Sequence, residues 1–274
     1  MILNAIPRLC IKLKRGAVMA GAVSMGCAPA ADDTEATSMA QAPIVKLLVA
    51  GQPVFGIFSG EHTSDQGALM VQNRETDFVF YSLESGPFDI PTMRAYMSGM
   101  ATNAPADGTH PLALRIPPIR DGEEAARERV RQGLDADVDA IVFPHVVTGD
   151  HAAAAVNAMG DDLWPGNPQG SLVTMLIVED QAGITNVRDI VSTPGVSVVF
   201  AGPGDLRRSY EGDMEAVEAA IQTVLAACEE FAVPCGITAG VNDIAERLEQ
   251  GFRVIIVTQP EALAAGRAAA GRTD

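Results

Sequence analysis

The chain reads LVTMLIVED from Leu172 to Asp180 and SVVFAGPGD from Ser197 to Asp205. Each stretch is a short, continuous apolar run that ends in acidic residues. Continuous rather than alternating apolar runs are typical of strands in a parallel sheet whose two faces are both covered by helices. The two stretches therefore predict parallel strands with carboxylates at their C-terminal ends.

Six more runs of the same kind lie elsewhere in the chain, at residues 53–58, 77–82, 111–116, 140–144, 235–238 and 252–257. Helix-like segments lie between the strands, at residues 122–132, 214–231 and 242–250. Eight apolar strands separated by helices predict an α/β fold, a (β/α)8 TIM barrel that forms a single domain over residues 44–274. An open doubly wound sheet is the alternative, but such a sheet more often has a glycine-rich phosphate turn after its first strand.

The composition excludes two broad classes of protein. The chain has 274 residues, of which 47% are apolar, so it can bury a large core and is not of the disordered class. It carries 35 acidic and 19 basic side chains, for a formal net charge of −16. Since nucleic-acid affinity comes largely from Lys and Arg that neutralise phosphates, this acidity argues against a nucleic-acid partner.

Residues 1–26 have the layout of a secretory signal peptide. No acidic residue precedes Asp32, and the apolar stretch 16–26 follows four basic residues, which are Arg8, Lys12, Lys14 and Arg15. That stretch is too short to span a bilayer as a helix, which needs about 20 residues. Removal of residues 1–26 would leave a formal charge of −20.

The end of this leader suggests a lipid anchor. Gly26-Cys27 resembles a bacterial lipoprotein processing site, in which Cys27 becomes the lipidated N-terminus and residues 27–43 form a linker. We therefore expect a protein of the bacterial cell envelope or periplasm, anchored to the membrane at Cys27. If translation begins instead at Met25 or Met39, we expect a cytoplasmic protein.

Polar residues at the predicted strand ends carry the chemical signal, because the active site of such a barrel lies at the C-terminal ends of its strands. These residues are Glu84, Arg115, His145, Glu179 and Asp205. Two carboxylates suit a hard divalent cation, and the planar fork of an arginine suits a substrate carboxylate. A metal ion and an arginine that face one cavity suit a 2-oxo acid, whose enolate the metal stabilises as a Lewis acid. Taken singly, each residue could instead be a helix cap or an ion-pair partner.

Three motifs carry a resemblance to a known family. They are FAGPGDL at 200–206, Val178-Glu179, and LRIP at 114–117. Together with the surrounding residues 44–257, they resemble the class II 2-oxo-acid aldolases of the HpcH/HpaI aldolase/citrate lyase family. That family consists of metal-dependent (β/α)8 barrels that cleave or form a bond to a pyruvate enolate.

The resemblance implies roles for particular residues. Glu179 and Asp205 would be the ligands of a divalent metal ion, Mg²⁺, Mn²⁺ or Co²⁺. Arg115 would bind the substrate carboxylate beside Gly202, Pro203 and Gly204. We expect the catalytic residues to be Arg115, Glu84 and His145, and the resemblance also implies a homo-oligomer.

The chain departs from the family pattern after its second strand. Ser85 stands where the resemblance implies a histidine, and Ser82 stands where it implies that histidine's aspartate partner. A serine hydroxyl has far too high a pKa to replace an imidazole as a base. Three alternatives remain: another base such as His145 or His62, hydroxide on the metal ion, or loss of aldol chemistry.

Two functions follow from these patterns. The first is a divalent-metal-dependent carbon–carbon lyase of the aldehyde-lyase type, which acts on a 4-hydroxy-2-oxo acid and whose small-molecule partners are a 2-oxo acid and an aldehyde. The alternative is an envelope protein that binds 2-oxo or dicarboxylic acids without this turnover. Cys228 and Cys235 could form a disulfide in an oxidising envelope or remain buried thiols.

Overall fold

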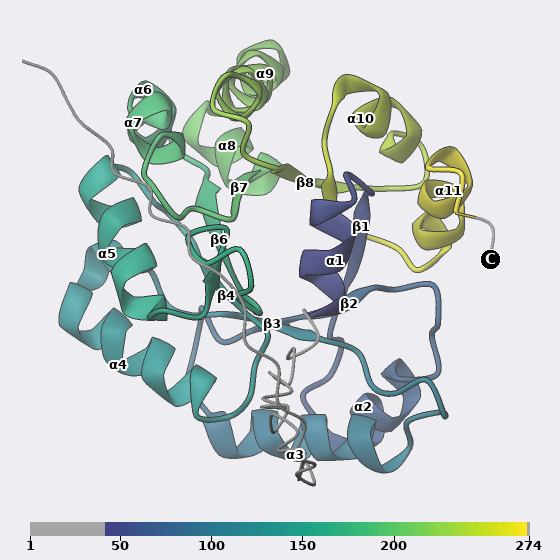
Figure 1. Ribbon diagram of the computed structural model, residues 1–274. Helices are drawn as coiled ribbons and strands as arrows, with labels where there is room; N and C mark the ends of the chain where they lie inside the picture. The colour runs from purple at the N-terminus through teal and green to yellow at the C-terminus, as the bar shows by residue number, and fades with distance from the viewer. Residues whose placement is uncertain (1–41, 273–274) are drawn as a thin grey trace, which may run out of the picture. The chain divides into compact units, whose positions relative to one another are not determined.

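Eight parallel strands close into a barrel in the computed structural model, which describes residues 42–272 (Figure 1). The barrel strands are β1 Val54–Phe58, β2 Phe78–Ser82, β3 Leu112–Arg115, β4 Ala140–Phe143, β6 Leu172–Val178, β7 Val198–Ala201, β8 Cys235–Ala239 and β9 Val254–Val257. They pair in the order β4-β3-β2-β1-β9-β8-β7-β6, and β4 pairs with β6 to close the ring. The predicted (β/α)8 TIM barrel is confirmed.

All eight predicted strands are present, with bounds that differ by a residue or two. β6 begins at Leu172 and ends at Val178, as the apolar run does. The sequence did not predict β5, Leu163–Trp164, which pairs with the start of β6. A strand of two residues has too little length to show a periodic pattern.

Helices and one 3₁₀ turn connect the strands. They are α1 Pro43–Val49, α2 Ser64–Met70, α3 Ile90–Thr102, the 3₁₀ turn η1 Ile119–Asp121, α4 Glu123–Leu134, α5 Gly149–Met159, α6 Gln181–Thr185, α7 Val187–Val191, α8 Pro203–Ser209, α9 Met214–Glu230, α10 Ile244–Gln250 and α11 Glu261–Ala269. Five of these helices begin after a residue whose side-chain oxygen accepts a backbone N–H of the first turn, namely Thr63, Asp89, Thr148, Asp180 and Asp213. These caps satisfy N–H groups that the helix itself leaves unpaired.

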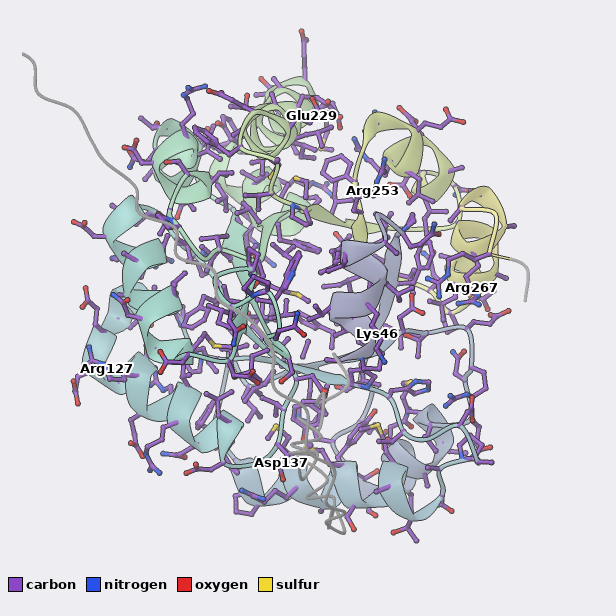
Figure 2. All side chains as sticks on the ribbon, in the orientation of Figure 1. Lys46, Arg127, Asp137, Glu229, Arg253 and Arg267 are labelled. Atoms are coloured by element: carbon purple, nitrogen blue, oxygen red, sulfur yellow. The ribbon has the colours of Figure 1, made fainter. Side chains whose placement is uncertain are left out.

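The core has two layers. An inner layer fills the barrel, and an outer layer lies between the strands and the surrounding helices. Helix α1 contributes Ile44, Val45 and Leu48 to the inner layer, where they join Val54 and Val254 from the N-terminal ends of their strands. In Figure 1, α1 lies at the centre of the ring of helices, so it covers the N-terminal end of the barrel. Figure 2 shows charged side chains such as Arg127 and Glu229 on the outer helices.

The predicted leader falls outside the described residues. This applies to the signal peptide 1–26, to Cys27, and to the linker as far as residue 41. The last two residues of the predicted linker belong to the barrel, because Ala42 is buried and Pro43 opens α1. Among the described helices, none has the length and apolar character needed to cross a membrane. Cys228 and Cys235 are both buried free thiols, so the disulfide alternative does not apply in this structure.

Candidate active site

The C-terminal ends of the strands surround a cavity of about 250 Å³. Its floor consists of apolar side chains that point into the barrel, namely Phe80, Ile177, Phe200 and Ile256. The rest of its lining comes from Phe58, Arg115, Glu179, Gly202, Pro203, Gly204, Asp205, Thr238 and Thr258. The predicted substrate arginine, the predicted glycine-rich turn and both predicted metal ligands therefore line one cavity.

Arg115 ends β3 and is held on one edge of its guanidinium group. Its Nε donates to Ser82 Oγ at 2.9 Å, and its Nη2 lies 3.0 Å from Glu84 Oε2. Its Cζ lies 5.2 Å from the centre of the Phe80 ring, which adds a cation–π contact. A guanidinium group has five N–H donors, so the remaining donors of Arg115 can bind a carboxylate in the cavity.

His145 follows β4 and lies between two carboxylates. Its φ of 52° is in the left-handed region, which is uncommon for residues other than glycine. Its backbone N–H donates to Glu179 Oε1 at 2.8 Å. Its ring Nδ1 is 3.4 Å from Glu179 Oε1, and its Nε2 is 3.7 Å from Glu84 Oε1. Nδ1 is buried but makes no hydrogen bond, so the ring is placed by the backbone and not by a side-chain hydrogen bond.

The carboxyl group of Glu179 has a raised pKa. Burial raises the pKa of the Glu179 carboxyl to about 8, against the hydrogen bond from His145 N–H, and the charges of Asp205 and Glu84 add to the rise. Burial, together with the charge of Arg120, lowers the pKa of the His145 imidazole. Both shifts favour the neutral forms, so the contact between these two groups is not an ion pair near neutral pH. Groups with such shifts in a cavity are typical of functional sites.

Three of these side chains could hold a metal ion. Glu84, His145 and Glu179 place one potential ligand atom each within 4.8 Å of one another. A divalent cation would supply the positive charge that the buried Glu179 carboxylate lacks, and it would give the unpaired His145 Nδ1 a partner. The residues present therefore fit a divalent metal ion.

Asp205 lines the same cavity as Glu179. It lies in the first turn of α8 and forms an ion pair with Arg208. Its charge acts on both Glu179 and His145, but among the described residues it is not part of the group of three ligand side chains. Gly202 keeps the space beside Glu179 open, since a Cβ atom there would lie 2.6 Å from Glu179 Cβ.

His62, the other candidate base, lies in a neighbouring cavity of about 220 Å³. Its ring stacks on Tyr81 at a centroid distance of 3.9 Å, and burial lowers its pKa. Ser82 and Ser85 line the same cavity. Ser82 therefore lines the cavity that contains His62 and also accepts a hydrogen bond from the guanidinium group of Arg115.

The sequence did not reveal the role of Ser82 in holding Arg115. Two features of strands β2 and β3 account for this contact. Ser82 is two residues beyond Phe80 on a strand, so both side chains point to the barrel interior. The parallel register pairs Ser82 with Arg115 on the neighbouring strand. Phe58, Thr238 and Thr258 also line the main cavity and were not singled out, because a lone aromatic or threonine at a strand end has no pattern of its own.

Comparison with known families gives one match that covers most of the barrel. The model of the HpcH/HpaI aldolase/citrate lyase family matches residues 63–258. This range includes all the predicted catalytic, substrate-binding and metal-binding residues, whereas the alternative base His62 lies one position before it.

Comparison with curated proteins and solved structures agrees with that match. A hydroxypyruvate/pyruvate aldolase from Paraburkholderia phytofirmans is 25% identical over 78% of this chain and 89% of its own length. A 5-keto-4-deoxy-D-glucarate aldolase from Klebsiella pneumoniae is 36% identical over 66% of this chain and 76% of its own length. The crystal structure of an HpcH/HpaI aldolase/citrate lyase family protein from Burkholderia cenocepacia superposes with a TM-score of 0.67 at 22% identity, covering 82% of this chain and 96% of that one. At that identity the superposition supports the fold alone.

Proposed function

The chain belongs to the HpcH/HpaI aldolase/citrate lyase family, and from that premise we propose that it is a divalent-metal-dependent carbon–carbon lyase acting on 4-hydroxy-2-oxo acids. The products would be pyruvate, or a related 2-oxo acid, and an aldehyde. The observation that carries the proposal is the placement of Arg115 and Glu179 on one cavity at the C-terminal ends of the strands. The names of the relatives support it, since they are a hydroxypyruvate/pyruvate aldolase and a 5-keto-4-deoxy-D-glucarate aldolase.

Arg115 is the group that would bind the substrate carboxylate. Ser82 and Glu84 already hold its Nε and Nη2, so the guanidinium is oriented before the substrate arrives. Such preorganisation keeps the substrate in one orientation and lowers the entropic cost of reaching the reactive geometry. A lysine would offer only a point charge at this position.

The metal ion, when bound, would act as a Lewis acid that polarises the 2-oxo group of the substrate. Glu179 would contribute to holding that ion. In the cleavage direction, the C3–C4 bond breaks and its electron pair becomes the enolate. The 4-hydroxyl group loses its proton as it becomes the aldehyde carbonyl, and the enolate carbon later gains a proton.

The cavity limits the size of the substrate. Its volume of about 250 Å³ lies below the range typical of drug-sized ligands, so it suits a short chain. The apolar floor from Phe80, Ile177 and Phe200 excludes water from the region where negative charge develops. Exclusion of water strengthens the electrostatic contacts made there.

Proton transfer requires a group that exchanges protons near neutral pH. His62 and His145 lie at this end of the barrel, and burial lowers the pKa of both. Both are therefore neutral near pH 7 and able to accept the proton of the 4-hydroxyl group. We expect one of these two histidines to carry it.

The direct test is pyruvate release from a set of 4-hydroxy-2-oxo acids, measured with Mg²⁺, Mn²⁺ or Co²⁺ and after chelation. We expect activity that requires the metal and that falls by about 100-fold or more in kcat/KM in Arg115→Lys, since the bidentate grip is lost. Arg253→Lys is a matched control, because that arginine donates to the backbone of Leu248 and Phe252 and not to this site. Absence of release with every metal and substrate, together with retained binding of oxalate, would favour the alternative of a binding protein.

A further inference from the structure

His62 lies at the C-terminal end of the barrel, in the loop between β1 and α2. It lines a cavity of about 220 Å³ whose walls include Ser82, at the end of β2, and Ser85, in the loop that follows β2. These two serines stand where the resemblance implies a histidine and its aspartate partner. An imidazole is therefore present beside the two serines, but it comes from the loop after the first strand and not from the loop after the second.

The loop that carries His62 is held on both sides of this residue. On one side, the hydroxyl group of Tyr96 in α3 donates to the carbonyl oxygen of Ser59 at 3.0 Å. On the other side, Thr63 Oγ1 accepts the backbone N–H of Gln66 at 3.1 Å and caps α2. Since both flanks are fixed by hydrogen bonds, the side chain of His62 starts from a defined point on the rim of the barrel.

A stacking contact fixes the plane of the His62 ring. Its centroid is 3.9 Å from that of the Tyr81 ring, and the two planes are inclined by 19°. Tyr81 is fully buried and packs edge-on against Tyr96, with a centroid distance of 5.2 Å. Such aromatic contacts add to the stabilisation that burial provides. The stack occupies one face of the imidazole and leaves both nitrogens at the edge of the ring, where no described residue forms a hydrogen bond or an ion pair with them.

The carboxylate in this cavity belongs to Asp89, and it is engaged elsewhere. Asp89 Oδ1 accepts the backbone N–H of Thr92 at 3.0 Å, and Oδ2 accepts the Thr92 hydroxyl at 2.7 Å. These contacts cap α3. The orientation of the His62 ring therefore depends on Tyr81 and not on a carboxylate partner.

His145, the other histidine considered for proton transfer, is in the opposite situation. Its Nδ1 lies 3.4 Å from Glu179 Oε1, and its Nε2 lies 3.7 Å from Glu84 Oε1. Both ring nitrogens thus face carboxylates. A base must come within hydrogen-bond reach of the proton that it takes, so a ring with unengaged nitrogens is better suited to the task.

Ser82 places His62 near the group that would bind the substrate. It lines the His62 cavity, and its Oγ accepts a hydrogen bond from Arg115 Nε at 2.9 Å. In a 4-hydroxy-2-oxo acid, the carbon that carries the hydroxyl group is only three carbon atoms from the carboxylate carbon. A substrate whose carboxylate is bound by Arg115 and whose chain turns toward Ser82 therefore brings the 4-hydroxyl group beside the His62 cavity.

We propose that His62 is the base of this site and that one of its ring nitrogens accepts the proton of the 4-hydroxyl group. The inference rests on the proposed lyase function and names the proton acceptor within it. As the proton leaves, the O–H electron pair becomes the second bond of the aldehyde carbonyl, and the C3–C4 electron pair passes into the enolate. The imidazolium of His62 then returns the proton to C3, which gives the 2-oxo acid and a neutral ring. Burial lowers the pKa of His62, which keeps the ring unprotonated at neutral pH.

The test removes the imidazole and supplies it again from solution. His62→Ala should lower kcat for cleavage by about 100-fold or more and change KM by less than about 3-fold, because Arg115 still binds the carboxylate. Free imidazole can enter the space beside Tyr81 and should raise kcat of His62→Ala by at least about 10-fold, without raising that of the wild type. Pyrazole has the same shape but is a far weaker base, so it should give no such increase.

A second measurement follows proton transfer without cleavage. Exchange of the C3 hydrogens of pyruvate for deuterium, observed by nuclear magnetic resonance in D₂O with Mg²⁺, Mn²⁺ or Co²⁺ present, reports the step at the enolate carbon. We expect His62→Ala to slow this exchange by about 100-fold and imidazole to restore it by at least about 10-fold. Thermal unfolding of each variant checks that it is folded.

Two other histidines serve as controls. His151 belongs to α5 and lines neither cavity, so His151→Ala should keep the wild-type cleavage and exchange rates and should not respond to imidazole. His145→Ala removes the ring between Glu84 and Glu179, and its rates should not rise when imidazole is added.

Cleavage and exchange rates in His62→Ala within about 3-fold of the wild type would overturn the assignment of the base and leave the lyase function intact. A loss of both rates that imidazole does not relieve would also overturn it, as would relief by imidazole in His145→Ala alone. If the wild type exchanges the pyruvate hydrogens through His62 but cleaves no 4-hydroxy-2-oxo acid, the base assignment stands and the lyase function fails. Absence of both reactions in the wild type would overturn both proposals.

Discussion

The two ends of the barrel both contain carboxylates that are largely buried, but the groups around these carboxylates differ. At the N-terminal end, Asp77 accepts the backbone N–H of Phe55 at 2.8 Å and forms an ion pair with Arg272 at 2.7 Å. Asp139 at the same end accepts the backbone N–H of Leu112 at 2.8 Å. At the C-terminal end, Glu179 also accepts a backbone N–H, and its side chain lines a cavity. The ring beside it is the imidazole of His145, whose lowered pKa keeps it neutral near pH 7.

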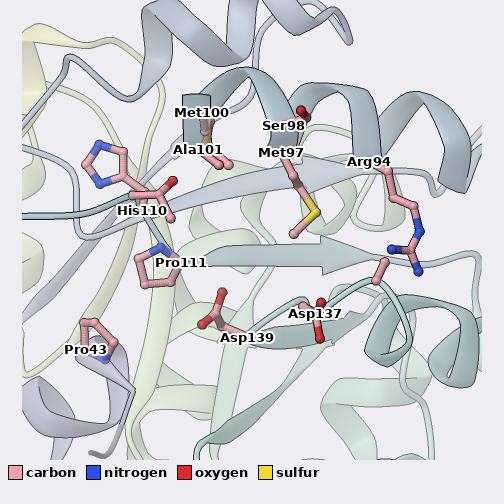
Figure 3. A pocket seen from close by; sticks show the side chains of 12 residues that line it. Pro43, Arg94, Met97, Ser98, Met100, Ala101, His110, Pro111, Asp137 and Asp139 are labelled. Carbon is pink, nitrogen blue, oxygen red and sulfur yellow. The ribbon is translucent and has the colours of Figure 1, made fainter. Parts of the chain in front are cut away.

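The two ends also differ in the volume of their cavities, and the larger cavity is at the N-terminal end. A pocket of about 460 Å³ lies at the N-terminal ends of β3 and β4, under α3 (Figure 3). It is larger than the cavity of about 250 Å³ at the other end. Figure 3 shows Arg94 and Met97 reaching from α3 toward the loop that holds Asp137. Arg94 donates to the backbone of Asp135 there, and among the described residues this pocket gathers no group of three metal-ligating side chains.

Volume and burial are therefore poor guides to the functional end. The larger pocket also has a carboxyl group with a raised pKa (Asp139), an unpaired ring nitrogen (His110) and a left-handed backbone (Asp137), so these features do not distinguish the two ends. Among the described residues, what distinguishes the C-terminal end is that Arg115 and three side chains able to hold a metal ion gather there. The contrast leads to four predictions, given from the largest effect to the smallest.

The largest effect should come from Glu179→Gln. The neutral amide cannot balance the charge of a divalent ion, so we expect kcat/KM for 2-oxo-acid cleavage to fall by about 1000-fold or more. The matched change at the other end, Asp139→Asn, keeps a side-chain oxygen for the Leu112 N–H and should alter kcat/KM by less than about 3-fold. Comparable losses in the two variants would remove the distinction between the two ends.

The second effect concerns stability at the N-terminal end. Asp77→Ala removes the acceptor of the Phe55 N–H and one side of a buried ion pair. We expect the free energy of unfolding to fall by about 3 to 4 kcal/mol, measured with urea, because the charges of Arg272 and Arg267 remain partly buried once this carboxylate is removed. A loss below about 1 kcal/mol would show that this carboxylate contributes no more than an exposed pair does.

The third effect is a gain in the free energy of unfolding, and its size depends on pH. The folded chain keeps the Glu179 proton up to about pH 8, whereas the unfolded chain releases it near 4.5. The unfolded state therefore binds fewer protons between these values, and the stability of the metal-free wild type falls as the pH rises through them. Glutamine does not titrate, so metal-free Glu179→Gln should be more stable than the wild type, by on the order of 3 kcal/mol near pH 8.

Urea unfolding at several pH values, in the presence of a chelator, measures this difference. The stabilisation should shrink steadily below pH 8 and be absent below about pH 4.5. A variant that is less stable than the wild type at pH 8 would mean that Glu179 has a structural role like that of Asp77.

The smallest effect should come from Ser82→Ala. Loss of the hydroxyl leaves the Nε of Arg115 without its acceptor, so the guanidinium is less well oriented while its charge and its contact with Glu84 remain. We expect KM for the 2-oxo acid to rise by about 5- to 10-fold with little change in unfolding free energy. Ser82→Thr keeps the hydroxyl and should restore most of the affinity. Equal KM values in Ser82→Ala and the wild type would contradict the positioning role.

The sequence alone was sufficient for the fold, and it placed the candidate site residues at one end of the barrel. Each barrel strand is a local apolar run, and a run of this kind can be recognised without knowledge of its neighbours. The rule that function lies at the C-terminal strand ends then selected Arg115, Glu84, Glu179 and His145, and the structure gathers these around the same end of the barrel. The GPGD turn resembled a family motif, and the family match agrees with it.

What only the tertiary structure decided is which of these groups meet. Glu84, His145 and Glu179 come from three loops, and His145 and Glu179 alone are 34 positions apart in the chain. Their contact depends on barrel closure between β4 and β6, on a left-handed backbone at His145, and on the absence of a side chain at Gly202. The Arg208 side chain that pairs with Asp205 and the Ser82 hydroxyl that holds Arg115 depend on the same packing. Apolar periodicity is a property of neighbouring residues, so the sequence carries it directly, whereas ligand distances of a few ångströms are set only once the strands have taken their places in the closed barrel.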